Sequence, residues 1–402
     1  MDVVIVESQT KANHIAEVLR EEGRIVETAA TGGSITEVKL GEKGFKLSLL
    51  PEKQERMKDI VSLSRGKDVF VASDCDREGE LIALSLFTML RGIAKSVSRS
   101  EMRDMTRKTI CSLFDRVRDI DLQTAYSAML RSCIDRNIGT IYSKKCSSDH
   151  KVYMPVGRVQ VPVIAHLADG PYRSDELFYP PRTGDVLAWC GETKNMKPRE
   201  TMRRLQDLYE KGKISYIRTD SAAPDEETVR YVRSLMGLDS VSFNQPKAVY
   251  EQRGHGCIRY MDFSEKLDDP VYSTLGELLE RSLTNDVNRI RPKEHTEASV
   301  IRYMQATGLG RPSTYVSSLE KVRENGYAGE NMKITEKGKR LLEWIDKEIP
   351  VLRTYTVFME KTLQAVEKGG SWRTALKDLY NGLVLPKGDG SKKIFSFAKE
   401  QD

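Results

Sequence analysis

A tyrosine beside a fixed positive charge is the first group in this sequence that could do chemistry. The stretch KISYIRTDSA places Tyr216 two residues before Arg218. A phenol with a pKa near ~10 is a poor nucleophile at neutral pH, so a reactive tyrosine needs a base and a stabilised transition state. Tyr216 is therefore either buried for packing or set up to react, and the rest of the sequence must decide which.

Four carboxylates stand within the seven residues DCDREGE at 74–80. In an extended loop that leaves a strand, the alternating residues Asp74, Asp76 and Glu78 would point to one side and converge. Hard carboxylate oxygens are what Mg²⁺ accepts, usually with waters and phosphate oxygens. The alternative is a solvated acidic loop, which is the commoner explanation of an arbitrary D-x-D.

The elements that must position these acids read as a parallel α/β sheet. A β-branched run at 2–6 ends at Glu7 and is followed by a helical stretch. A second run at 68–74 again ends in an acid before a helix. Acids that follow parallel strands meet at the carboxyl edge of the sheet. With Lys11 four residues beyond Glu7, that edge offers a proton-transfer carboxylate and a cation for phosphate, which predicts phosphoryl-transfer chemistry.

The remaining chain reads as mainly helical. Residues 106–168 have helical periodicity. Residues 169–186 are rich in Gly, Pro and Asp and are interpreted as a boundary. The basic stretch at 197–213 is interpreted as a helix with a solvated face. Two helices joined at GLGRP, with Ser313 as N-cap of the second, and a short hairpin at 326–335 form a winged helix-turn-helix pattern. Such a unit commonly binds duplex DNA, although many serve only for packing.

The composition limits the class of protein. The 402 residues exceed one core and predict several domains, and 64 Lys+Arg against 59 Asp+Glu leave a net charge of +5, so a DNA site must be a local patch. The six cysteines include no C-x-x-C pair, which argues against structural zinc and against a disulfide framework. No apolar run approaches the ~18 residues of a membrane span. We therefore expect a soluble protein of a reducing, cytoplasmic compartment, associated with DNA and not with membrane.

Several separated motifs occur in the order found in type IA DNA topoisomerases. The strand-end Glu with a Lys four residues on, followed by D-x-D-R-E-G-E, resembles the Toprim domain of topoisomerases, primases and small nucleases. The further motifs are AMLRSCIDRNIG, MPVGRVQ, ISYIRTDS, HGCIR and TGLGRPSTY. From residue 2 to about residue 370 the chain is thus similar to bacterial topoisomerases I and III.

The resemblance implies roles for the catalytic residues. Tyr216 would be the nucleophile and would end on a 5′ phosphate, while Arg218 and Lys11 would hold that phosphate. Glu7 would protonate the leaving 3′ oxygen and act as base on return. Asp74, Asp76 and Glu78 would hold the Mg²⁺ that places the free 3′ end for resealing.

No ATP is expected in such a reaction. The phosphotyrosine keeps the energy of the broken phosphodiester, so resealing is nearly isoergic, and the chain contains no G-x-x-x-x-G-K-[ST] loop. The expected partners are single-stranded and negatively supercoiled DNA, bound by a monomer. The residues expected to contact DNA are Arg131, Asp135, Arg158, Gln160, His255, Arg259, Arg311, Ser313 and Thr314.

This chain also departs from the family pattern. Ser34 in GGSITE stands where relatives usually have a histidine, HGCIR lacks the acid commonly found after its histidine, and Pro155 replaces a small polar residue. Only 55 residues separate Gln160 from Tyr216, where relatives insert a long β-rich arch. We therefore expect a minimal core enzyme.

The predicted fold class is α/β plus mainly α, with an N-terminal Toprim parallel sheet, helical and winged-helix modules and a short β-rich arch, which the resemblance arranges as a toroidal type IA core. The expected segments are the Toprim domain (1–115), a helical DNA-groove module (116–169), a shortened arch (170–196 and 260–291), the tyrosine domain (197–259), the winged-helix-like module (292–385) and a mobile tail (386–402).

Two other functions stay open beside a type IA topoisomerase. A Toprim nuclease or primase would use the acids and keep Tyr216 as a structural residue, but such proteins do not carry Y-x-R-T-D-S and G-L-G-R-P-S-T-Y. A DNA-binding accessory protein without catalysis would be derived from such an enzyme, but every residue that the chemistry needs is present.

Overall fold

The computed structural model describes residues 1–402 except 42–43, 103, 238, 247–255, 285 and 384–402. It divides the chain into two compact units, Met1–Asn137 with Met359–Asp402, and Ile138–Phe358. The chain enters the second unit at the end of helix α5 (Leu122–Asn137) and returns to the first within helix α15 (Tyr355–Glu367). Each unit is described by itself.

The first unit is built on a five-stranded sheet with the order β2-β1-β5-β6-β7. All neighbouring pairs are parallel except β6 and β7. Its elements are β1 (Val3–Val6), α1 (Gln9–Glu21), β2 (Glu27–Ala30), β3 (Thr36–Gly41), β4 (Gly44–Leu49), α2 (Gln54–Ser64), β5 (Asp68–Val71), α3 (Arg77–Leu90), β6 (Ser96–Ser100), α4 (Arg107–Cys111), β7 (Val117–Arg118), α5 and α16 (Trp372–Asn381).

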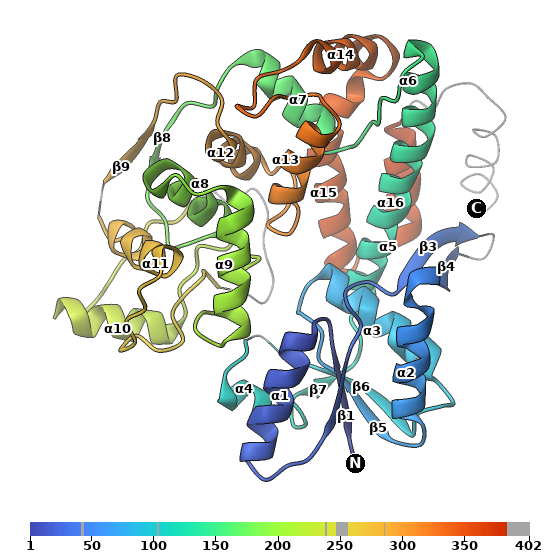
Figure 1. The fold of residues 1–402 in the computed structure, drawn as a ribbon, viewed down its shortest axis with the longest axis vertical. Coiled ribbons are helices and arrows are strands. Elements are labelled where there is room, and N and C mark those ends of the chain that lie inside the picture. The colour runs from blue at the N-terminus through green and yellow to red at the C-terminus, as the bar shows by residue number, and fades with distance from the viewer. Residues whose placement is uncertain (42–43, 103, 238, 247–255, 285, 384–402) are drawn as a thin grey trace. The chain divides into compact units, whose positions relative to one another are not determined.

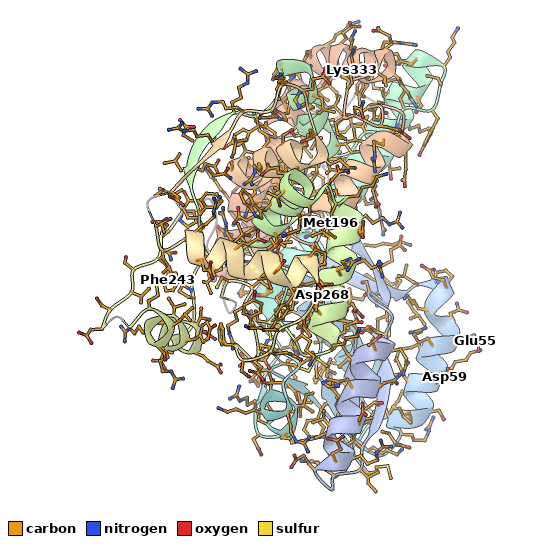
Figure 2. The ribbon with its side chains drawn as sticks, turned by 60° about the vertical axis from the view of Figure 1, so that its left-hand side comes forward. Glu55, Asp59, Met196, Phe243, Asp268 and Lys333 are labelled. Atoms are coloured by element: carbon orange, nitrogen blue, oxygen red, sulfur yellow. The ribbon has the colours of Figure 1, made fainter. Side chains whose placement is uncertain are left out.

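The sheet is covered by helices on both faces, which explains the continuous apolar run of β1. All four residues of β1 are buried, and Val3 and Ile5 share one core cluster with α2 and α3. Helix α1 lies on the opposite face (Figure 1). The outer side of α2 is polar, and Glu55 and Asp59 project from it away from the sheet (Figure 2). The alternating α/β order predicted from the sequence is confirmed for this unit.

The hairpin of β3 and β4 packs against helices from both ends of the first unit's sequence. The rings of Phe45 and Trp372 lie 4.7 Å apart between centroids, and Tyr126 on α5 lies 5.7 Å from Trp372. Helix α16 also packs along α5. The last helix is therefore part of the sheet-containing unit, which the sequence did not indicate.

The second unit is mainly helical. Its elements are a π-helical turn (Ile138–Tyr142), α6 (Ser143–His150), α7 (Gln160–Asp169), β8 (Ser174–Leu177), α8 (Thr183–Lys194), α9 (Pro198–Glu210), α10 (Glu226–Met236), α11 (Pro270–Arg281), β9 (Val287–Ile290), α12 (Glu297–Thr307), α13 (Tyr315–Glu324), α14 (Glu336–Glu348) and the start of α15.

The two helices of the winged-helix pattern are present, with one correction at the second, and the expected hairpin at 326–335 is a single β-bridge between Ala328 and Ile334. Helix α12 begins with a capping box at Thr296 and ends at Gly308, whose φ of 68° is the left-handed conformation that glycine tolerates. Helix α13 has Thr314 as its N-cap, so the prediction of Ser313 was wrong by one residue. The Oγ of Thr314 accepts from the N–H of Arg311 at 2.9 Å, and this local turn sets the helix start.

The segments 170–196 and 260–291 are more helical than the β-rich arch expected for them. Strands β8 and β9, of four residues each, form one antiparallel pair, whereas helices α8 and α11 have 12 residues each. These helices pack on each other, and the Nε1 of Trp189 donates to Glu277 at 2.9 Å. The apolar residues Val186, Leu187, Ala188 and Cys190 of α8 are buried, so packing between helices replaces strand pairing here.

The structure divides into two units, whereas the sequence predicts six segments. The boundaries of those six segments stay a prediction. The expected mobile tail at 386–402 lies outside the described residues. In the part of the chain that the structure describes, no helix is long and apolar enough to cross a membrane.

A pair of substitutions in α3 tests the packing of the first unit. Leu86 is fully buried in the core beside the sheet, whereas its neighbour Phe87 is 41% exposed. We expect Leu86→Ala to lower the free energy of unfolding by about 2–5 kcal/mol, because a cavity remains. Phe87→Ala should cost no more than about 1 kcal/mol. Urea denaturation followed by circular dichroism measures both, and equal losses would contradict this assignment of the core.

Candidate active site

The carboxyl end of β1 places an acid and a lysine at the edge of the sheet. Glu7 follows the strand directly, and Ser8 caps α1 by accepting from the N–H of Lys11 at 3.3 Å. Because α1 starts immediately, Glu7 and Lys11 are separated by about one helical turn and their side chains meet. The Nζ of Lys11 lies 3.1 Å from the Oε2 of Glu7.

The end of β5 brings a second acid to the same point. The Nζ of Lys11 lies 2.5 Å from the Oδ1 of Asp74, and both side chains are almost fully buried. The backbone N–H of Asp74 donates to the Oε1 of Glu7 at 2.9 Å. The predicted meeting of Glu7, Lys11 and Asp74 at the carboxyl edge is therefore what the structure has.

This cluster changes the acidity of Glu7. Burial is the largest of the influences that raise the pKa of Glu7 to about 8; the negative charges of Asp74 and Asp76 act in the same direction, and the positive charge of Lys11 opposes them. A carboxyl group with such a pKa is protonated at neutral pH. Glu7 can thus donate a proton, which an ordinary exposed glutamate could not do.

The acidic turn does not have the extended shape expected from the sequence. Asp76 is the N-cap of α3 and accepts from the N–H of Gly79 at 2.8 Å, and Glu78 already lies in the helix. Asp74, Asp76 and Glu78 therefore do not alternate along one side of a loop. Among the described residues, no group of three or more His, Cys, Asp or Glu side chains is arranged to hold a metal ion. Helix α3 begins directly after Asp76, because the side chain of Asp76 accepts from the N–H of Gly79 in the first turn, which has no partner within the helix.

The donor chemistry at this turn nevertheless fits a hard cation. The negative charges of Asp74 and Asp76 both act on Glu7, which shows that carboxylates are concentrated at this edge. Lys11 engages Asp74, so Asp76 and Glu78 are the better candidates to hold Mg²⁺.

An arginine that the sequence did not single out shapes the same turn. Arg99 on β6 is fully buried and donates to the carbonyl oxygens of Val71, Ser73 and Asp74 at 2.7–3.1 Å. Its Nε donates to Glu80 at 3.0 Å. A single arginine in SVSRS carries no sequence signal for this role, because the contacts come from the parallel pairing of β5 and β6.

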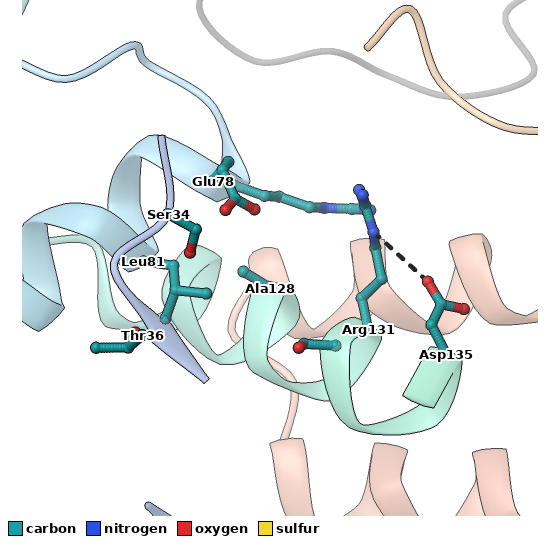
Figure 3. A pocket seen from close by; sticks show the side chains of 9 residues that line it. Ser34, Thr36, Glu78, Leu81, Ala128, Arg131 and Asp135 are labelled. Atoms are coloured by element: carbon teal, nitrogen blue, oxygen red, sulfur yellow. Dashed lines mark ion pairs between the residues drawn. The ribbon is translucent and has the colours of Figure 1, made fainter. Parts of the chain in front are cut away.

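A pocket of about 250 Å³ lies beside the first turn of α3. Figure 3 shows Ser34 and Glu78 on one side of it and Arg131 and Asp135 of α5 on another. The Nε of Arg131 lies 3.9 Å from the Oδ2 of Asp135. Ser34, which stands in place of the usual histidine, and the two expected DNA-contact residues therefore share one pocket with a candidate metal ligand.

In the second unit, Tyr216 lies in an irregular segment that is fixed on both sides. Thr183 at the start of α8 donates to the carbonyl oxygen of Ile217 at 2.6 Å and accepts from the N–H of Thr219 at 2.9 Å. The ring of Tyr209 packs edge-on against that of Tyr216, with centroids 5.8 Å apart. Thr183 and Tyr209 carried no motif signal, yet they hold the segment that carries the tyrosine.

The acid that follows this segment is held by the winged-helix module. The hydroxyl of Tyr315 donates to the Oδ1 of Asp220 at 2.9 Å, and Arg311 lies 4.0 Å from the Oδ2. Burial raises the pKa of Asp220, while Arg311 and Tyr315 oppose that shift. Within the second unit, the motifs ISYIRTDS and TGLGRPSTY are therefore in direct contact.

Among the described residues, the others expected to contact DNA do not line the pocket beside α3 and differ in burial and in their partners. Arg158 and Gln160 are both buried at the start of α7, and the carbonyl oxygen of Arg158 accepts from Thr356 at 2.8 Å. The guanidinium of Arg259 lies 2.5 Å from Asp225, so this arginine pairs with an acid of its own unit. Ser313 is exposed. His255 lies outside the described residues.

Comparison with protein families identifies two regions of the chain. Residues 2–104 match the Toprim domain, and residues 282–377 match the family described as DNA topoisomerase. The fold is similar to that of full-length topoisomerase I from Thermotoga maritima, with a TM-score of 0.74 at 18% identity over 94% of this chain and 89% of that one.

Related proteins carry topoisomerase names. A DNA topoisomerase 1 of Aquifex aeolicus is 23% identical, with 94% of this chain and 97% of the relative covered. A DNA topoisomerase 1 of Helicobacter pylori is 22% identical, with 98% and 76% covered. Reverse gyrase 2 of Aquifex aeolicus is 22% identical, but this chain spans only 40% of its length.

The sheet with acids at its carboxyl edge lies in the part of the first unit that matches the Toprim domain, residues 2–104. Together with the topoisomerase match over residues 282–377 and the named relatives, it places the chain in the type IA DNA topoisomerase family. The alignment with the first Aquifex relative runs over 529 positions, more than the 402 residues here, so that relative carries additional segments.

Gly79 offers a test of the acidic turn. A Cβ at this position would lie 1.9 Å from the carbonyl oxygen of Asp74, so Gly79→Ala must push the first turn of α3 away from the strand end. We expect a loss of about 1–3 kcal/mol in the free energy of unfolding. Gly139→Ala is the control, because its Cβ would meet nothing within 4 Å. Thermal denaturation of both variants measures the difference, and an unchanged midpoint for Gly79→Ala would contradict the close packing.

Proposed function

We propose that this protein cleaves one strand of DNA through a 5′-phosphotyrosine at Tyr216, passes another strand through the break and reseals it, without ATP and with Mg²⁺. The result would be relaxation of negatively supercoiled DNA. The observation that carries the proposal is the pairing of two sites in one chain. One unit holds Glu7, Lys11 and Asp74 in contact, and the other holds Tyr216 in a segment fixed by Thr183.

The nucleophile would be the hydroxyl of Tyr216. Its oxygen would give up its proton to water and attack the phosphorus of a backbone phosphate, and the bond from phosphorus to the 3′ oxygen would break. Arg218 would stabilise the charge on the phosphate oxygens through its two-pronged donors. Thr183 and Tyr209 would limit the motion of the segment that carries the ring.

The proton for the leaving 3′ oxygen would come from Glu7. Its raised pKa keeps Glu7 protonated at neutral pH, and the same group would take the proton back during resealing. Lys11 lies between Glu7 and Asp74 and would add a positive charge for the phosphate.

Asp76 and Glu78, with Asp74 beside them, would hold Mg²⁺. When bound, the ion would supply positive charge for the free 3′ end and the phosphate during resealing. No part of this proposal requires ATP. The DNA would be single-stranded where it is cut, and affinity would come mainly from arginine and lysine contacts to phosphates by a monomer.

Tyr216→Phe tests the proposal. We expect the variant to form no covalent complex with a labelled single-stranded oligonucleotide and to relax no plasmid, because only the reacting oxygen is removed. Its DNA affinity should stay within about twofold of the unsubstituted protein. Denaturing gels and a plasmid assay with Mg²⁺ and no ATP measure these properties, with Tyr260→Phe as the control.

The same assay separates the other functions. Cleavage that survives in Tyr216→Phe but requires the acids would indicate a Toprim nuclease. DNA binding without any covalent complex in the unsubstituted protein would indicate an accessory protein. Either outcome would remove the topoisomerase activity proposed here.

The raised pKa of Glu7 predicts a pH dependence of cleavage. The protonated acid is present below pH 8 and is lost as the pH rises through about 8, so the initial rate of covalent-complex formation should fall across that range. The assay uses a single-stranded oligonucleotide in the presence of a chelator. In Glu7→Gln the rate should be low throughout and should lack this fall. A rate that only increases up to pH 9 would argue against Glu7 as the general acid.

A further inference from the structure

Arg77 lies between Asp76 and Glu78, the two residues proposed to hold the metal. It has been given no role so far, either in metal binding or in phosphate binding. It is the first residue of α3, directly after the N-cap Asp76 and before Glu78. Its side chain is only 12% exposed, and its Nη1 lies 2.7 Å from the Oε2 of Glu360. Its Nε also donates to Glu367. Two of its nitrogens are therefore engaged by carboxylates from α15.

The two acids that receive Arg77 are themselves held in place. The side chain of Glu360 is 1% exposed, so its charge depends on a partner inside the protein. The hydroxyl of Ser127 on α5 donates to the Oε1 of Glu367 at 3.0 Å. Arg77 thus joins the start of α3 to two other helices of the first unit.

This connection determines the direction of the first turn of α3. Arg77 is the first helical residue, and successive residues of a helix are separated by about 100° around its axis, so a fixed side chain at position 77 also fixes the direction of Glu78 and the start of the helix next to the N-cap Asp76. Without the guanidinium, the buried carboxylate of Glu360 would lose the cation beside it, and the connection between α3 and α15 through Arg77 would be lost. The turn would then rotate or fray, and the acids would lose their geometry.

On the basis of the proposed metal site, we propose that Arg77, held by Glu360 and Glu367, is a positioning residue that orients Asp76 and Glu78 for Mg²⁺ binding and resealing. Arg77 also lines the pocket of Figure 3 with Glu78 and Arg131. A direct role on a DNA phosphate is the competing explanation. The engagement of its Nε and Nη1 by acids favours the positioning role.

The test measures Mg²⁺ binding on the intact protein without DNA, by isothermal titration and by the increase in melting temperature with MgCl₂. Arg77→Ala should raise the half-saturating Mg²⁺ concentration by about 10-fold, the range expected when a group that orients metal ligands is removed. Resealing of a preformed covalent complex should slow to a similar degree. Cleavage in the presence of a chelator should change little.

Arg302→Ala is the matched control. Arg302 is 5% exposed and binds Glu192 through two hydrogen bonds of 2.6 and 2.7 Å, so it is a buried arginine with an acid partner in the second unit. It should lose stability as Arg77→Ala does, without a change in half-saturating Mg²⁺. If Arg77→Ala does not fold, Ser127→Ala serves instead, because it weakens the hold on Glu367 and should shift Mg²⁺ binding in the same direction but less.

Two results would overturn the positioning role. One is an unchanged half-saturating Mg²⁺ concentration in Arg77→Ala or in Ser127→Ala. The other is a loss of single-stranded DNA affinity in Arg77→Ala with Mg²⁺ binding unaltered, which would assign Arg77 to phosphate contact. Failure of the proposed function would look different, because the unsubstituted protein would then form no covalent complex at Tyr216 or bind no Mg²⁺.

Discussion

The concentration of carboxylates at one edge of a parallel sheet is the constraint on which the first unit depends. Glu7 follows β1 directly, and Asp74, Asp76, Glu78 and Glu80 lie between the end of β5 and the first turn of α3, so like charges are concentrated there. The structure compensates with cations from separate elements. Lys11 comes from α1, Arg99 from β6 and Arg118 from β7, and each contacts at least one of these acids. The elements that pack around the sheet therefore also supply the positive charges that neutralise the acids at its carboxyl edge.

The second unit holds the proposed nucleophile, Tyr216, in a different way. Tyr216 belongs to no regular strand, so its backbone cannot rely on a ladder of sheet hydrogen bonds. Side chains and a short backbone bridge hold it instead. Thr183 bonds the backbone of Ile217 and Thr219 on one side. On the other side the N–H of Ser215 donates to the carbonyl oxygen of Arg259, and the N–H of Arg259 donates to the Oγ of Ser215. An irregular segment held by side chains can present a phenol at an angle that a flat strand would not allow. The cost is that several buried polar groups must all find partners.

The sequence predicted the sheet and the contacts of Glu7, Lys11 and Asp74, because strand-end position in a parallel sheet is set by short-range patterns of burial and helix capping. It did not predict the shape of the acidic turn. An extended loop and a capped helix place Asp76 and Glu78 differently, and only the hydrogen bond from Gly79 and the contact of Gly79 with Asp74 decide between them. The same limit applies to Arg99, Thr183 and Tyr315. Their partners lie tens of residues away, so no local pattern could identify them.

Helix α15, through which the chain returns to the first unit, also takes part in the pairing of charges near the carboxyl edge of the sheet. Glu360 and Glu367 stand on the helix that begins in the second unit and ends in the first, and they receive the arginine that lies between two of the proposed metal ligands. A helix resists bending because its backbone hydrogen bonds are continuous, so the acids are tied to an element that leaves their own unit. In the proposed reaction the metal ligands must keep the same geometry through cleavage and resealing. Anchoring them on three helices of the first unit, rather than on the loop alone, meets that need.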